Sequence, residues 1–362
     1  MLTIVRFLLL PFSWIYGLVV ILRNVLYDRG GLKSQAFQLP VIVVGNLEVG
    51  GSGKTPVIEY LIRFLRGKYR LAVLSRGYGR KSHGFIQVRA GTSSAVASAR
   101  EIGDEPFQYF SKFPNITVAV HADRVAAIER LKTEHEVILL DDAFQHRRLQ
   151  PGFSILVLDY NTLFRPRFLL PAGNYREPFA GRKRASLLLV SKAPRQISAE
   201  ERARIISRLS PEADQPVCFS SLEYDGLEAL DPSRPLPVIG PETRVLLLTG
   251  IARPVPLVKQ VKKRTPHVTH MKYPDHHSYT VKNIAKIAEV FEGIPAPDKL
   301  ILTTEKDAAR LRGDGLKEKV MQLPVFYWPV RINIHESDRQ LFHGKILEYI
   351  RDSRSFREPG NK

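Results

Sequence analysis

The stretch GNLEVGGSGKTP, residues 45–56, has the composition of a phosphate-binding loop. Its glycines let successive backbone N–H groups turn toward one anion, and a following helix adds the positive end of its dipole. The lysine that ends such a loop reaches the β- and γ-phosphates, and the next hydroxyl residue ligates Mg²⁺. We therefore predict a nucleoside triphosphate site here. The predicted binding residues are Gly50, Gly51, Ser52, Gly53, Lys54 and Thr55.

One position departs from the strict pattern G-x-x-x-x-G-K-[ST], because Glu48 stands where that pattern has glycine. The match is therefore to the second half of the pattern. The surroundings favour a true phosphate loop over an incidental glycine-rich turn, since the apolar run PVIVVGN precedes it and an amphipathic helical pattern follows it.

A phosphate loop also requires a carboxylate for the metal at the end of a neighbouring strand. EVILLDD supplies Asp141 and Asp142 after four apolar residues, as a Walker B strand does. Two aspartates after a strand can also form a solvated turn or a helix cap, but beside a phosphate loop the metal role is favoured for Asp141. A guanine-reading Asn-Lys-x-Asp sequence is absent, which favours ATP.

Two further stretches carry groups that can activate an acceptor hydroxyl. EIGDEP places Asp104 and Glu105 in an expected turn bounded by glycine and proline, although Asp104 can equally cap a helix. YPDHHSYT places His276 and His277 side by side, and because neighbouring side chains in an extended chain point opposite ways, we expect only one to act.

Basic residues gather in LLPAGNYREPFAGRKRA, which follows the apolar run SILVLD. They are Arg176, Arg182, Lys183 and Arg184. Two interpretations stay open at this point. The cations can grip an acidic substrate, or they form a solvated or membrane-facing surface.

The elements that must position these residues alternate between short apolar runs and helical stretches, which predicts an α/β fold with a mostly parallel sheet covered on both faces. A proline-rich stretch separates this series of apolar runs and helical stretches from a second, smaller series of the same kind. We expect the following organisation: a hydrophobic helix at 1–30, a P-loop core at 31–225, a linker at 226–242, a smaller α/β domain at 243–335, and a C-terminal helix at 336–362 that returns to the core.

The N-terminus contains an uncharged run between Arg6 and Arg23. As a helix this run covers roughly 24 Å, less than the roughly 30 Å of a bilayer's hydrocarbon core. The flanking arginines, together with Trp14 and Tyr16, suit a helix that lies in or dips into an anionic membrane surface. A packed core helix and a signal peptide are the alternatives, although no small-residue cleavage site follows.

The bulk composition narrows the possible partners and the compartment. The chain has 362 residues, 44% of them hydrophobic, which is enough for about two domains. Its net charge of +18 fits an anionic partner such as a phosphorylated substrate, an anionic membrane or nucleic acid. The single cysteine excludes an internal disulfide and suits a reducing, cytoplasmic setting.

The assembled stretches resemble those of the tetraacyldisaccharide 4′-kinase family of lipid A synthesis. The matching stretches are VGNLEVGGSGKTP, LSRGYGR, GDEP, LLDDAFQHRRL, LLPAGNYREP, LTGIARP, YPDHHSY and TTEKDAAR, over about residues 40–310. The resemblance implies a kinase that uses ATP and Mg²⁺ to phosphorylate the 4′-hydroxyl of an acylated glucosamine disaccharide 1-phosphate. It also implies two α/β/α domains and a place at the cytoplasmic face of the inner membrane of a Gram-negative bacterium.

The resemblance also implies roles for individual residues. Asp104 would activate the sugar hydroxyl with help from His276. Lys54 would hold the phosphates, while Thr55 and Asp141 would bind the metal. Asp142 and Arg176 would be further polar groups of the active site.

Other classes of function are less well supported by the sequence. A membrane-recruited P-loop ATPase that acts as a nucleotide-dependent switch would use the same loop without Asp104 or His276. Nucleic-acid binding lacks a recognised module or aromatic platform, so we expect none. The sequence indicates no obligate protein partner.

Overall fold

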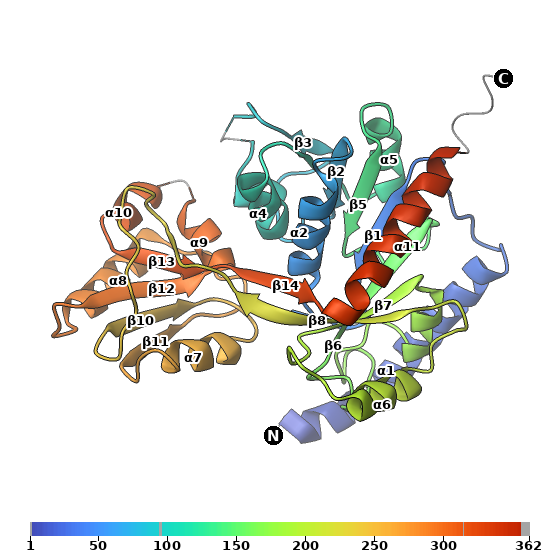
Figure 1. Ribbon diagram of the computed structural model, residues 1–362. Coiled ribbons are helices and arrows are strands. Elements are labelled where there is room, and N and C mark those ends of the chain that lie inside the picture. The colour runs from blue at the N-terminus through green and yellow to red at the C-terminus, as the bar shows by residue number, and fades with distance from the viewer. Residues whose placement is uncertain (1, 94–95, 314, 356–362) are drawn as a thin grey trace.

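The chain folds around two β-sheets joined by a pair of strands (Figure 1). The computed structural model describes residues 2–93, 96–313 and 315–355. The larger sheet has nine strands in the order β14-β8-β7-β6-β1-β5-β2-β4-β3. These strands are β1 (Val41–Gly45), β2 (Leu71–Ser75), β3 (Ile86–Val88), β4 (Thr117–Val120), β5 (Val137–Asp141), β6 (Phe153–Asp159), β7 (Leu187–Ser191), β8 (Val217–Tyr224) and β14 (Val330–Ile334).

The central strands of the larger sheet are parallel and buried along their whole length, as their continuous apolar runs require. One face is covered by α2 (Lys54–Leu65), α4 (Asp104–Lys112) and α11 (Glu336–Ser355). The other face is covered by α5 (Arg124–Leu131), α6 (Ala199–Leu209) and the 3₁₀ helix η1 (Phe179–Arg184). The predicted α/β class with a parallel-dominated sheet is confirmed.

The smaller sheet has five strands in the order β11-β10-β12-β13-β9. They are β9 (Glu228–Ala229), β10 (Arg244–Thr249), β11 (Val268–Lys272), β12 (Lys299–Thr304) and β13 (Val325–Trp328). The helices α8 (Val281–Glu292), α9 (Glu305–Leu311) and α10 (Lys317–Met321) cover one face, and α7 (Val255–Lys262) covers the other. Between β3 and α4 lies the short helix α3 (Ala99–Ile102).

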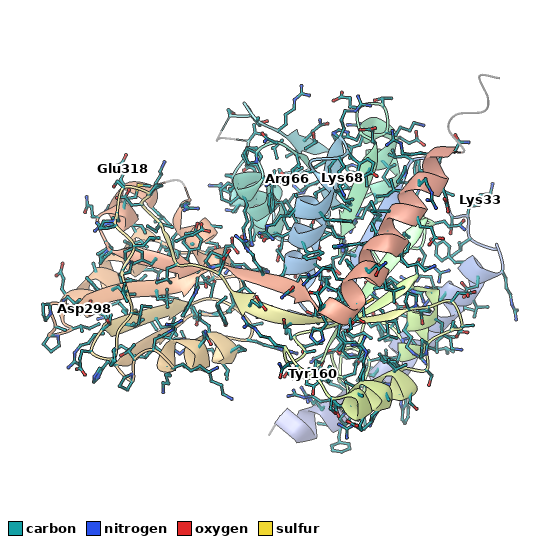
Figure 2. The ribbon with its side chains drawn as sticks, viewed as in Figure 1. Lys33, Arg66, Lys68, Tyr160, Asp298 and Glu318 are labelled. Atoms are coloured by element: carbon teal, nitrogen blue, oxygen red, sulfur yellow. The ribbon has the colours of Figure 1, made fainter. Side chains whose placement is uncertain are left out.

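The smaller sheet presents the carboxyl ends of its strands to the larger one. In Figure 1 the arrows of β12 and β13 point toward the larger sheet. Asp298, which precedes β12, lies at the far end of the smaller unit, as the labels in Figure 2 show. Loops that follow parallel strands therefore meet the larger sheet, which is where ligand-binding residues collect in such folds.

The chain returns to the larger sheet earlier than expected. We expect the smaller domain to extend to residue 335, but the last strand of the smaller sheet, β13, ends at Trp328, directly before Pro329. The strand β14 that follows pairs antiparallel with β8 in the larger sheet. Its alternating pattern VRINI buries Ile332 and Ile334 there, and a half-buried edge strand of this kind differs from the continuous apolar runs of the parallel strands.

The N-terminal helix α1 (Leu2–Asp28) is longer than the uncharged run within it. Its 27 residues span about 40 Å, because the helix continues through Arg23 to Asp28. In the described part of the chain, one helical segment, Arg6–Asp28, has the length and the apolar composition needed to cross a membrane. Most of its large apolar side chains are exposed, including Trp14 at 72% and Leu18 at 67%.

The helix α11 provides a direct test of the core. Phe342 is fully buried against the larger sheet, whereas its neighbour Leu341 is 44% exposed. We expect Phe342→Ala to lower the free energy of unfolding by about 3–5 kcal/mol through lost burial and the cavity left behind. Urea denaturation would measure this, with Leu341→Ala as the control at about 0.5 kcal/mol or less. Equal effects of the two substitutions would contradict this packing.

Candidate active site

The phosphate loop connects β1 to α2, and α2 begins at Lys54. Gly50 and Gly53 have φ angles of +106° and +99°, which side chains rarely adopt. A Cβ on Gly53 would also lie 2.8 Å from Ser191 Oγ. Within the described part of the chain, the buried hydroxyl of Ser52 has no hydrogen-bond partner, so the loop keeps an unused donor.

Lys54 is held between two polar neighbours. Its Nζ donates to Asn46 Oδ1 at 3.0 Å and lies 3.5 Å from Asp142 Oδ1. Burial lowers the pKa of Lys54, although Asp142 opposes this. Arg176 Nη1 in turn donates to both carboxylate oxygens of Asp142, at 2.8 and 3.0 Å. The structure thus brings together Lys54, Asp142 and Arg176, three of the predicted residues.

Asp141 ends β5 next to the strand that carries the phosphate loop. Its Oδ2 accepts a hydrogen bond from Tyr109 Oη at 3.1 Å. Burial, with the nearby charges of Asp142 and Glu105, raises the pKa of Asp141 to about 7. A bound cation would stabilise the negative charge of this buried carboxylate. Tyr109 also contacts Thr55, the other predicted metal ligand.

Asp104 is the first residue of α4 and does not lie in the expected turn. Pro106 does not interrupt the helix, because a proline in the first helical turn loses no hydrogen bond. Asp104 is not the cap residue either, since Gly103 precedes the helix. Tyr109, which binds Asp141, lies five residues further along the same helix, about 7.5 Å along its axis. Asp104 is therefore carried by the same helix as the tyrosine that binds Asp141.

Asp104 meets two groups from the smaller sheet. His276 Nδ1 lies 3.0 Å from Asp104 Oδ2, and Arg310 donates to the same oxygen from Nε at 3.0 Å and from Nη2 at 2.7 Å. Burial alone would raise the pKa of Asp104, but the hydrogen bonds from His276 and Arg310 lower it to about 2. The hydrogen bond to Asp104 raises the pKa of His276.

The two adjacent histidines have different partners. His277 Nε2 lies 3.2 Å from Asn283 Oδ1, and its ring packs against Tyr273. His276 instead has a φ of +57°, a conformation that costs a non-glycine residue free energy and persists only where the surroundings impose it. Of the pair, His276 is therefore the one that contacts Asp104.

Further ion pairs cross from α4 to α9. Glu105 Oε1 lies 2.6 Å from Lys306 Nζ. Lys112 Nζ lies 2.5 Å from Glu305 Oε1 and 2.7 Å from Glu59 Oε2 on α2. Charged groups of α4 and α9 thus form several contacts between the smaller and the larger sheet.

The remaining basic residues of the 169–185 stretch are bound to other groups of the same chain. Arg182 Nε donates to the Leu209 carbonyl, Lys183 lies 2.7 Å from Glu212, and Arg184 lies 2.8 Å from Glu177. A different cation stands near the carboxylates instead. Arg124 is 5% exposed, and burial together with Arg76 lowers its pKa to about 10.

Several groups of the site were not identified from the sequence. Asn46 was overlooked although it lies within the quoted phosphate loop, and Gln145 lies in the quoted stretch LLDDAFQHRRL and donates to the Asn46 carbonyl at 2.7 Å. Tyr109 and Arg310 carry no local signal, because each acts on a residue distant in the chain. Arg310 lies within TTEKDAAR, which matched the family without a role being assigned to the arginine.

The fold and these groups define the chain as a P-loop phosphotransferase: a phosphate loop and a Walker B carboxylate lie beside an acid–histidine pair that can receive a hydroxyl proton.

Comparisons with known proteins identify the family within this class of phosphotransferases. The family model for Tetraacyldisaccharide-1-P 4′-kinase matches residues 5–350. Two enzymes named tetraacyldisaccharide 4′-kinase are similar: one from Bacteroides thetaiotaomicron is 41% identical over 95% of this chain and 93% of its own, and one from Flavobacterium psychrophilum is 43% identical over 95% and 97%. The crystal structure of LpxK from Aquifex aeolicus in complex with ATP superposes with a TM-score of 0.71, at 32% identity over 96% and 99% of the two chains. The chain belongs to the tetraacyldisaccharide-1-P 4′-kinase family.

The phosphate loop can be tested at Gly53. An alanine there would have to adopt a φ near +99° and would contact Ser191 Oγ, so we expect Gly53→Ala to weaken ATP binding by about tenfold or more. Calorimetric titration with ATP would measure this. Gly67→Ala is the control, since that site has open space and no positive φ. Normal ATP affinity in Gly53→Ala would contradict the role of this turn.

Proposed function

We infer that this chain is a lipid kinase that transfers the γ-phosphate of ATP to the 4′-hydroxyl of tetraacyldisaccharide 1-phosphate, a step of lipid A biosynthesis. One observation carries the chemistry: Asp104, held by His276, lies on the same helix as the tyrosine that binds the Walker B carboxylate. A nucleotide switch has no need of this pair, and membership of the kinase family does not favour that alternative.

In the proposed reaction the loop amides and Lys54 hold the phosphates of ATP. Asp104 Oδ2 is occupied by His276 and Arg310, while Oδ1 accepts no hydrogen bond from the described residues. Oδ1 is therefore the atom that receives the acceptor hydroxyl. The hydroxyl oxygen attacks the γ-phosphorus, its proton passes to the Asp104–His276 pair, and the bond to the ADP oxygen breaks.

The proposed metal is Mg²⁺, held by Asp141 and Thr55. A hard cation fits the oxygen donors there and the buried carboxylate of Asp141. When bound, Mg²⁺ neutralises charge on the phosphates. Asp142 and Arg176 have a different role, since they form a hydrogen-bonded pair beside Lys54 that holds the lysine's ammonium group in place.

The acceptor's own phosphate requires cations near the site. Arg124 and Arg76 provide them, because two neighbouring guanidiniums, one nearly fully buried, favour an anion between them. The exposed apolar side chains of α1 support a location of the enzyme at the membrane that holds the lipid. Since ATP is cytoplasmic, we propose the cytoplasmic face of the inner membrane.

The function is tested directly by mixing purified protein, Mg-ATP and the disaccharide 1-phosphate in detergent. We expect the lipid to gain the mass of one phosphate. ATP turnover that is independent of the lipid would favour the switch instead.

The proposed base is tested by Asp104→Ala. We expect turnover to fall by on the order of a hundredfold or more, because the hydroxyl proton loses its acceptor, while ATP affinity stays near normal. Steady-state kinetics and ATP titration separate the two effects. Lys54→Ala provides the contrast, since it should also impair ATP binding. Near-normal transfer in Asp104→Ala would remove this residue from the mechanism.

The acid limb of the pH–rate profile should report His276. With a pKa of about 2, Asp104 stays ionised near neutrality, so the proton that blocks the pair is the one on His276, whose pKa is raised above 6.5. Turnover should therefore rise with pH through that raised pKa, and His276→Gln should abolish this limb as well as lower the rate. A wild-type rate that is flat from pH 6 to 9 would contradict this assignment.

A further inference from the structure

The helix α1 rests on the protein through a narrow stripe of small and polar residues. Ser13 is 3% exposed and Val20 is 6% exposed, whereas Trp14 and Leu18 on other faces of the helix are largely exposed. A Cβ on Gly17 would lie 2.6 Å from Leu169 Cδ1, so the helix approaches its neighbour closely there. This face of the helix therefore packs against one specific segment of the protein.

The helix packs against the segment 168–177, which ends next to the predicted site. Ser13 Oγ donates to the Leu169 carbonyl and accepts from the Ala172 amide, both at 3.0 Å. Further along the helix, Asn24 Nδ2 donates to Glu177 Oε2 at 3.3 Å. Contacts from α1 thus follow the segment from its start to its end.

The contact of greatest consequence is made by Tyr16. Its Oη donates to the backbone carbonyl of Arg176 at 2.7 Å. The backbone amide of Arg176 donates to the Leu47 carbonyl at 2.8 Å, at the start of the phosphate loop. The peptide groups of Arg176 are therefore fixed on one side by the phosphate-loop region and on the other by α1.

The side chain of Arg176 extends this connection to the reacting groups. It binds both oxygens of Asp142, and Asp142 lies beside Lys54. A shift of the Arg176 backbone would move the guanidinium away from Asp142, and displacements of about 1 Å are enough to impair positioned catalysis.

We propose that Tyr16 is a positioning residue for phosphoryl transfer, which couples the seating of the N-terminal helix to the Arg176–Asp142–Lys54 chain. This rests on the proposed function of Arg176. Tyr16 is 160 residues away from Arg176 in sequence and belongs to a helix whose large apolar side chains are mostly exposed. Its hydrogen bond gives the membrane helix a mechanical connection to the phosphate site.

The test compares Tyr16→Phe with Tyr27→Phe in the full chain, assayed in detergent micelles with the disaccharide 1-phosphate. Tyr27 lies on the same helix, and the described residues provide no hydrogen bond to its hydroxyl. We expect Tyr16→Phe to lower kcat by about three- to tenfold, the value of one hydrogen bond. We expect KM for ATP and flotation with phosphatidylglycerol vesicles to be unchanged. Tyr27→Phe should match the wild type.

A double mutant separates positioning from simple anchoring. If Tyr16 acts through Arg176, then Tyr16→Phe should have little further effect on kcat in an Arg176→Lys background. A lowered melting temperature or weaker flotation with unchanged kcat would mean that Tyr16 only anchors the helix, and would overturn the proposal. So would fully additive effects.

The same variants distinguish failure of this proposal from failure of the proposed function. Normal turnover in Arg176→Lys would remove Arg176 from the mechanism, and the coupling would fail with it. Impaired turnover in Arg176→Lys together with normal turnover in Tyr16→Phe would overturn only the coupling.

Discussion

The arrangement depends on one carboxylate that is shared between the two sheets. Asp104 belongs to the larger sheet's layer, but the groups that hold its charge, Arg310 and His276, come from the smaller one. Arg310 is nearly buried and is itself fixed by Asp307 and by the carbonyl of Gly250. Without Asp104 the Nε and Nη2 groups of this buried guanidinium would lose their carboxylate partner, so the electrostatics that keep Asp104 ionised also favour contact between the smaller sheet and α4.

The parts that could be predicted from the sequence are those in which the signal is local. The strand that ends at Gly45, the glycines of the loop and Lys54 all lie within residues 41–54, and the Walker B aspartates directly follow their own apolar run. Arg310 could not be found this way, because it lies 206 positions from Asp104 and only the fold brings the two together. The strand β14 was missed for a related reason, since its partner β8 is more than 100 residues away.

The charge of +18 illustrates how composition can indicate a partner without locating it. Cations that looked available in the sequence are engaged within the protein, as Arg184 is with Glu177 and Arg182 with the end of α6. The cation of interest to an anionic ligand is instead a buried one with an unused donor: burial lowers the pKa of Arg124 to about 10, and its buried Nε has no hydrogen-bond partner among the described residues. Such a site is created by packing, and a count of lysines and arginines contains no information about packing.

The N-terminal helix shows the same dependence on packing. A helix that served only as a tether would gain nothing from Ser13, Tyr16 and Asn24, since polar side chains are costly in hydrocarbon unless they face a partner. Here each of them faces the segment 168–177, and the exposed sides of the helix stay apolar. At the membrane location that we propose, the free energy of hydrogen bonding and that of membrane insertion would favour the same rotation of the helix about its axis. A lipid kinase needs this agreement, because its acceptor arrives along the membrane and its phosphate donor is held by the loop that Arg176 contacts.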